Sequence, residues 1–279
     1  MLSTSVVISP RRGYNCPDWQ PRVRPSSVAI LKLPSPIQLI LLDIDGVLSE
    51  GEGRPLDLEL LGRLASLNRA ARATPAAPAV TLCSGRPAPY LEVMMQAIDA
   101  HLPGIFENGA GLYYAHPYSF LPHPALAGSD QIPQVREALD RGLIQTGRAF
   151  IQPGKLHTLT LFAEDPAETR LLAEWAEAAL GPLAAQVDLV YSTSCLNVLP
   201  HGIDKGLGVG WLAERTGVPL EVMLGVGDSD VDLPFLKRVG HSAAPSNANA
   251  SVRAIVDYTA PHPTASGVRD ILAHYGLLA

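Results

Sequence analysis

The sequence has few cysteines, few aromatic residues and no long apolar run. Its three cysteines, Cys16, Cys83 and Cys195, are widely spaced in 279 residues and match neither a disulfide framework nor a metal-ligand spacing. The apolar stretch around Ala29–Leu42 is interrupted by a lysine and two prolines, so no segment is predicted to span a membrane. These absences favour a reducing compartment, and we expect a cytoplasmic protein.

Charge is also scarce, at 17% of residues, and the formal net charge of −6 gives no support to a nucleic-acid-binding role. Positive charge gathers in residues 1–38, which contain arginines, prolines and serines and a single acid. We predict that this segment is a disordered leader. An organelle-targeting leader has a similar composition and is the alternative.

The rest of the chain alternates short apolar runs with amphipathic stretches. Ile37–Leu42 is typical of a strand buried on both faces, and leucines at helical spacing follow over Leu56–Arg72. The alternation returns late in the chain, where Lys205–Thr216 is predicted to be a helix and Val222–Val226 a strand. This order predicts an α/β fold with a Rossmann-like parallel sheet flanked by helices.

The middle of the chain departs from this alternation. Two helical and three extended segments are expected there: Ile132–Ile144, Pro166–Leu180, Lys155–Ala163, Val187–Tyr191 and Cys195–Leu199. We therefore predict an inserted α/β cap domain over residues 113–196, between two segments of a catalytic core at 39–112 and 197–279.

Acidic side chains follow the first predicted strand. Asp43 and Asp45 lie two residues apart, so in an extended chain they point to the same side. Paired carboxylates repel each other and need a cation or a raised pKa. One carboxylate can attack phosphorus, while the other protonates a leaving alcohol and later activates water.

Three further motifs supply groups suited to phosphoryl chemistry. Ser84–Arg86 follows a second apolar run, and a hydroxyl with adjacent backbone N–H groups can bind a phosphoryl oxygen. Lys205 opens a predicted helix and can neutralise a phosphoryl group. Asp228 and Asp232 follow a later strand and offer the carboxylate oxygens that Mg²⁺ prefers.

In this chain order the four motifs resemble those of the haloacid dehalogenase superfamily phosphatases, over residues 39–275. The finer resemblance is to the subgroup with an α/β cap, which includes the Cof-type sugar phosphatases, sucrose-phosphate phosphatase, mannosyl-3-phosphoglycerate phosphatase and phosphomannomutase. Glu107–Ala110 is similar to its Asn-Gly-Ala turn, and Asn197–Gly206 is similar to its approach to the lysine. The acid cluster differs at Val231, where relatives usually carry asparagine.

The resemblance implies a phosphate-monoester hydrolase that uses Mg²⁺ and a phosphorylated aspartate. Asp43 would be the nucleophile and Asp45 the proton donor and acceptor, with Ser84 and Lys205 binding the transferred group. The metal would be held by Asp43, by the backbone carbonyl of Asp45 and by Asp228, and Asp232 would hold a ligating water.

Five residues are candidate substrate contacts: Gly85, Arg86, Asn108, Lys155 and His157. The last two share one face of a predicted cap strand, and caps of this kind close over the core site. The expected partner is a small phosphorylated metabolite, such as a sugar phosphate. The sequence names neither the ester nor the oligomeric state.

Two other functions fit the same motifs. A phosphomutase would return the phosphoryl group to the sugar, and it would need cap groups that hold a bisphosphate. A phospho-aspartate signalling domain would need a long-lived acyl phosphate, which a second acid at Asp45 opposes. Both remain alternatives to hydrolysis.

Overall fold

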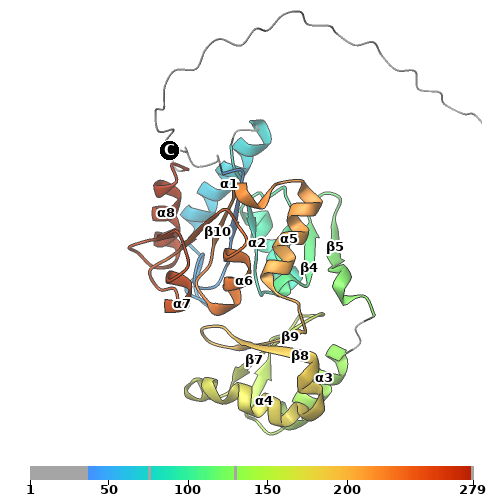
Figure 1. Ribbon diagram of the computed structural model, residues 1–279. Helices are drawn as coiled ribbons and strands as arrows, with labels where there is room; N and C mark the ends of the chain where they lie inside the picture. The colour runs from blue at the N-terminus through green and yellow to red at the C-terminus, as the bar shows by residue number, and fades with distance from the viewer. Residues whose placement is uncertain (1–36, 75–76, 129–130, 278–279) are drawn as a thin grey trace, which may run out of the picture. The chain divides into compact units, whose positions relative to one another are not determined.

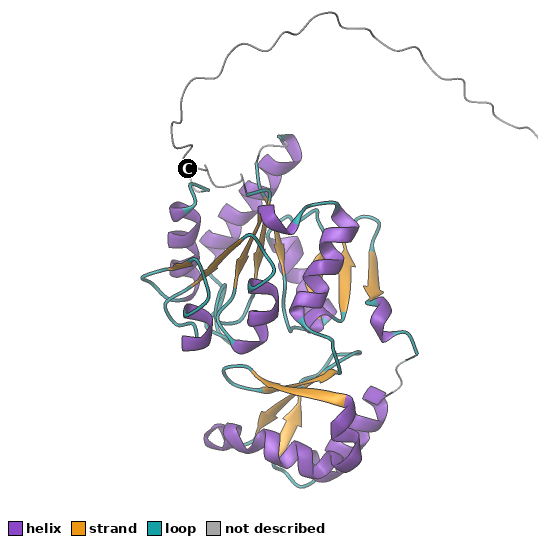
Figure 2. Ribbon diagram, viewed as in Figure 1, coloured by secondary structure: helices purple, strands orange, loops and turns teal. Residues whose placement is uncertain are grey.

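The computed structural model describes residues 37–74, 77–128 and 131–277. All but two residues of the predicted leader lie outside the described residues. Figure 1 labels the elements, and Figure 2 shows how helices and strands are distributed. Within the described ranges, no helix has both the length and the apolar character needed to cross a membrane.

A five-stranded parallel sheet forms the centre of the core. Its strands, in order across the sheet, are β12 (Tyr258–Thr259), β11 (His241–Ala244), β10 (Met223–Val226), β1 (Leu39–Leu42) and β2 (Ala79–Leu82). Every residue of β1 is buried, because helices cover both faces of the sheet. The predicted Rossmann-like parallel sheet is confirmed.

Two groups of helices sandwich this sheet. One group is α1 (Leu58–Ala73), α2 (Ala88–Ala97) and α8 (Thr264–His274); the other is α5 (Lys205–Thr216), α6 (Leu233–Leu236) and α7 (Ala250–Arg253). Alternate side chains of β1 join the two apolar clusters that result. Ile40 and Leu42 lie in the cluster with α1, α2 and α8, whereas Leu39 and Leu41 lie in the cluster with α5, α6 and α7.

A second sheet adjoins the core. It is antiparallel and contains β3 (Gly104–Phe106), β4 (Gly111–Tyr114) and β5 (Ser119–Pro122). The turn Glu107–Gly109 reverses the chain after Ile105-Phe106, so that β3 pairs antiparallel with β4. Just after β2, Cys83 forms a parallel bridge with Ile105 of β3, and the N–H of Ser84 donates to the carbonyl of Ile105 at 3.0 Å.

The cap contains a third sheet and its own apolar cluster. The antiparallel strands are β6 (Ala149–Ile151), β7 (Leu159–Ala163), β9 (Leu196–Pro200) and β8 (Val187–Tyr191), with α3 (Gln131–Leu139) and α4 (Leu172–Leu180) packed on them. The strand predicted to begin at Lys155 begins at Leu159, because the preceding amides bind a core carboxylate. The division at residues 113 and 197 stays a prediction. It falls inside β4 and β9, and we propose placing the cap between β5 and the end of β9.

Candidate active site

The ends of β1 and β10 bring acidic groups together at one edge of the parallel sheet. The backbone N–H of Asp43 donates to the carbonyl of Val226, with an N···O distance of 3.0 Å. The chain then turns at Gly46, whose φ is +79°. A Cβ added there would lie 2.1 Å from a carboxylate oxygen of Asp228, so a glycine lets the turn approach this acid.

Lys205 lies between two of these acids. It is the first residue of α5, and the Asp204 side chain caps that helix by accepting from the N–H of Leu207 at 2.7 Å. The Lys205 Nζ atom is 2.9 Å from Asp43 Oδ1 and 2.6 Å from Asp232 Oδ1. Burial lowers the pKa of Lys205, but Asp232 and Asp43 outweigh burial and raise it above its usual value, so the ammonium is charged.

Asp232 has both carboxylate oxygens engaged by the protein. Oδ1 accepts from Lys205, and Oδ2 accepts from the backbone N–H groups of Asp228 (2.9 Å) and Ser229 (3.0 Å). The Ser229 hydroxyl also donates to Oδ2 at 3.3 Å, and with the N–H of Asp232 it completes a capping box. Asp232 therefore fixes the loop after β10 and orients Lys205.

The carboxylate of Asp228 is less engaged than that of Asp232, because its buried Oδ1 atom has no hydrogen-bond partner among the described residues. Ligand atoms of Asp43, Asp228 and Asp232 lie within 4.8 Å of one another. Burial, followed by the Asp232 and Asp43 charges, raises the pKa of Asp228 to about 9; burial also raises the pKa of Asp43 to about 7. Burying several negative charges costs free energy, and one carboxylate oxygen here lacks a hydrogen-bond donor. Both features fit a hard cation such as Mg²⁺.

Arg86, on the neighbouring loop, forms a salt bridge with Asp45. Its Nε donates to Asp45 Oδ2 at 2.7 Å and its Nη2 to Oδ1 at 2.6 Å, a two-pronged charge-assisted pair. Gly85 and Arg86 both line the cavity described below, whereas Ser84 does not. The fully buried Ser84 hydroxyl accepts from the N–H of Arg86 at 3.2 Å, so it supports the loop that carries the arginine.

The cap contributes a polar network opposite these groups. Lys155 donates to the hydroxyl of Thr160, which donates to Asn197 Oδ1 at 2.9 Å. Asn108, from the core, donates to the same Asn197 oxygen at 3.2 Å, and within the described part of the chain its own Oδ1 has no partner. The network therefore joins the two parts of the chain directly above Gly85.

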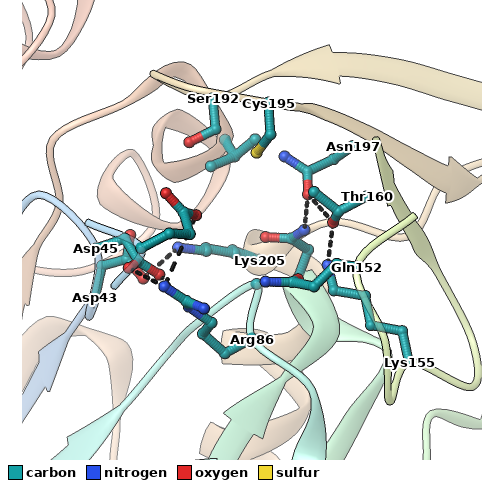
Figure 3. Close-up of a pocket in the computed structure, with 14 residues that line it drawn as sticks. Asp43, Asp45, Arg86, Gln152, Lys155, Thr160, Ser192, Cys195, Asn197 and Lys205 are labelled. Carbon is teal, nitrogen blue, oxygen red and sulfur yellow. Dashed lines mark hydrogen bonds and ion pairs between the residues drawn. The ribbon is translucent and has the colours of Figure 1, made fainter. Parts of the chain in front are cut away.

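A small cavity lies between the core and cap groups. Figure 3 shows Asp43, Asp45, Arg86 and Lys205 on one side and Lys155, Thr160 and Asn197 on the other. Sequence reasoning assigned no site role to five of the lining residues: Glu52, Gln152, Thr160, Cys195 and Val231. Apart from the unusual Val231, these positions carry no motif, so only the fold could reveal them.

His157 is not part of this cavity. Its ring stacks on Phe106, with centroids 6.4 Å apart, and it lines a separate hollow near Pro122 and Pro133. The predicted strand alternation would have placed it beside Lys155. Because β7 begins only at Leu159, the two side chains do not share a strand face.

Comparison with known proteins relates part of this chain to a family of hydrolases. The profile of the haloacid dehalogenase-like hydrolases matches residues 149–272. Over this range, which is less than half of the chain, the sequence is similar to the haloacid dehalogenase-like hydrolases. The predicted resemblance and fold class are confirmed, and the matched range includes Lys205 and Asp228.

Relatives of this hydrolase are phosphatases by name. A phosphoglycolate phosphatase of Methanopyrus kandleri is 27% identical over 84% of this chain and 95% of its own length. One of Methanothrix thermoacetophila is 34% identical, but the match spans 34% of this chain and 43% of that protein. The sucrose-phosphatase structure of Synechocystis sp. PCC6803 shares the fold, with a TM-score of 0.61 at 16% identity, over 88% of this chain and 100% of that one. The predicted phosphatase class agrees with these names.

Proposed function

We propose that this chain hydrolyses the phosphate monoester of a small metabolite through a phosphorylated Asp43. The observation that carries the proposal is the arrangement around Asp43. Its carboxylate is 2.9 Å from the Lys205 ammonium and lines the same cavity as the paired Asp45 and Arg86. A nucleophile, a fixed positive charge and a second carboxylate are the groups that stepwise phosphoryl transfer requires.

In the first step an Asp43 oxygen attacks phosphorus, the phosphorus–oxygen bond of the ester breaks, and Asp45 gives a proton to the departing alcohol oxygen. In the second step water attacks phosphorus and gives a proton to Asp45. The bond to Asp43 then breaks and inorganic phosphate leaves. Lys205 holds the nucleophile and balances the negative charge that spreads over the phosphoryl oxygens.

The salt bridge between Arg86 and Asp45 affects the two proton transfers that Asp45 makes. A guanidinium fork stabilises the ionised carboxylate, which suits Asp45 as a base. An entering phosphoryl group offers Arg86 a second anion. We propose that the arginine shifts toward that group and frees Asp45 to carry the proton that the first step needs.

Mg²⁺ is the metal that we propose for this site. Asp43 and Asp228 would hold it with the backbone carbonyl of Asp45, since the Asp45 carboxylate is engaged by Arg86 and both Asp232 oxygens by the protein. Asp232 would act on the metal indirectly, through a bound water or the loop geometry. When bound, Mg²⁺ supplies positive charge between the nucleophile and the phosphoryl oxygens.

The cap residues that line the cavity are consistent with a small anionic substrate. Lys155 is 5% exposed and lines the cavity, and among the described residues it forms no ion pair. The cavity volume is about 30 Å³, room for one or two water molecules, which favours a small substrate. With relatives named phosphoglycolate phosphatase, these features favour an ester with a nearby carboxylate that meets Lys155.

Replacing Lys155 with alanine is expected to lower kcat/KM for phosphoglycolate about 10- to 100-fold, because a charge-assisted hydrogen bond to the carboxylate is lost. For p-nitrophenyl phosphate, which lacks a carboxylate, kcat/KM should change less than about threefold. The matched control is Lys237→Ala on the exposed surface, which should leave both esters unaffected. Equal losses for both esters would assign Lys155 to chemistry or folding instead.

The mutase alternative receives less support from the cavity. Of the four cap arginines that could hold a bisphosphate, Arg136, Arg141, Arg148 and Arg170, none lines it. Arg141 pairs with Glu137, and Arg148 lies over the ring of Trp175. Interconversion of two hexose phosphates by the purified protein would restore that alternative.

A further inference from the structure

One turn of the core touches the cap at three successive residues. The Phe106 ring stacks on His157, the Glu107 carboxylate binds backbone amides of the cap, and the Asn108 amide donates to Asn197. Each contact joins residues about 50 or more positions apart in the sequence. We name Phe106–Asn108 the docking turn.

The central contact is the most specific of the three. Glu107 Oε1 accepts from the N–H of Leu156 at 3.0 Å, and Oε2 accepts from the N–H groups of His157 at 2.8 Å and Thr158 at 2.9 Å. The Thr158 hydroxyl adds a fourth bond at 3.2 Å. Three successive amides that point at one carboxylate form an anion-binding nest, and here a buried side chain of the core occupies it.

The nest directly follows Lys155 in the sequence. Fixing the amides of residues 156–158 therefore fixes the backbone from which the Lys155 side chain reaches the cavity. The negative charge of Glu107 also acts on the Lys155 ammonium. Burial lowers the pKa of Lys155 to about 8, and Glu107 opposes part of that shift.

The docking turn is tied to the loop that carries Arg86 as well. The N–H of Glu107 donates to the carbonyl of Arg86 at 3.1 Å, and the N–H of Asn108 donates to the carbonyl of Ser84 at 3.0 Å. Glu107 and Asn108 both have left-handed backbones, with φ of +48° and +57°. Such conformations cost free energy in residues other than glycine, so these surrounding contacts hold the turn in a strained shape.

We infer that Glu107 is a positioning residue that docks the cap on the core, setting Lys155 and Asn197 over the loop that carries Arg86. This inference deepens the proposed function by assigning the contact that assembles its substrate site. The docking contact itself exists in the protein without substrate. It can therefore be tested whether or not the proposed hydrolysis is correct.

The test is hydrogen–deuterium exchange on the full chain carrying Glu107→Gln, read by mass spectrometry. Glutamine keeps the size of the side chain but loses the charge and one acceptor. Exchange at the amides of Leu156, His157 and Thr158 is expected to accelerate about tenfold or more. Exchange in β9 should stay unchanged, because its bonds to β7 and β8 do not involve Glu107. The control Glu137→Gln removes an exposed cap carboxylate and should change neither segment.

Unchanged exchange at residues 156–158 in Glu107→Gln would overturn the inference. An equal acceleration in β9 would also overturn it, because Glu107 would then support folding of the whole cap rather than its docking.

Kinetics give a second readout of the same variant. Glu107→Gln is expected to raise KM for phosphoglycolate about tenfold and to leave kcat within about threefold, because the groups around Asp43 are untouched. A loss confined to kcat would contradict a positioning role. Should the wild-type protein hydrolyse no phosphate ester, the proposed function fails, while the exchange result still decides whether Glu107 docks the cap.

Discussion

Replacing Asp43 with asparagine is expected to reduce turnover of every phosphate ester by about 10³-fold or more. The amide has nearly the same shape as the carboxylate, but it is a poor nucleophile and cannot form the acyl phosphate. Steady-state kinetics and acid-quenched labelling with a ³²P-phosphorylated substrate check this result. The wild-type protein should retain label, and the variant should retain none.

The same variant should stay folded. Burial raises the pKa of Asp43 to about 7, so the ionised carboxylate is costly in the metal-free protein, and Lys205 keeps Asp232 as a partner. We expect a melting temperature equal to or above that of the wild type. The control is Asp165→Asn in the cap, where asparagine serves equally well as a helix N-cap. Undiminished activity in Asp43→Asn would overturn the proposed mechanism.

Removing the metal is expected to have the second-largest effect. Treatment with EDTA should reduce activity to background, and Mg²⁺ should restore it. Asp228→Asn should raise the Mg²⁺ concentration for half-maximal activity about tenfold or more, since a neutral amide replaces a ligand whose Oδ1 has no protein partner. Full activity in metal-free buffer would contradict the site. Rescue by Zn²⁺ in preference to Mg²⁺ would also contradict it, because the donors are hard oxygens.

Stability gives a readout of the metal that does not depend on activity. In the metal-free fold the pKa values of Asp43 and Asp228 are about 7 and about 9, against 3.8 for a free aspartate. The folded state therefore binds protons more tightly than the unfolded state, and the free energy of unfolding falls as pH rises from about 4 toward 9. Mg²⁺ compensates the ionised carboxylates, so it should raise the melting temperature more at pH 8.5 than at pH 6. Equal shifts at both pH values would contradict this assignment.

The local pattern of the sequence was sufficient to predict the core elements and the positions of its acids. The apolar run before Asp43 became β1, and the run before Asp228 became β10, because each is fully buried and has little alternative to a strand in a covered parallel sheet. Helix α5 has the predicted bounds, with Asp204 capping it and Gly217 ending it. These features depend on neighbours within a few residues, which a sequence displays directly.

The course of the chain after β2 was not predictable in this way. Ile105-Phe106 has the composition of a buried parallel strand, yet it pairs in an antiparallel sheet. Likewise, the alternation from Lys155 to Ala163 suits a strand, but its first residues give their amides to Glu107 instead. For the amides after Lys155, a partner distant in sequence outcompeted the local pattern, whereas β3 pairs with β4, the next strand along the chain.

The sequence by itself determined which charged residue types lie near Asp43. The spacing Asp43–Asp45, the lysine that opens α5 and the acids after β10 follow from residue type and strand ends, since parallel strands end at one edge of a sheet. Only the tertiary structure decided how these groups are engaged: Arg86 on Asp45, Asp232 on Lys205, and Glu107 in the amides of the cap. Those contacts join residues far apart in the chain, so side-chain placement in the folded state selects them, and periodicity carries no information about them.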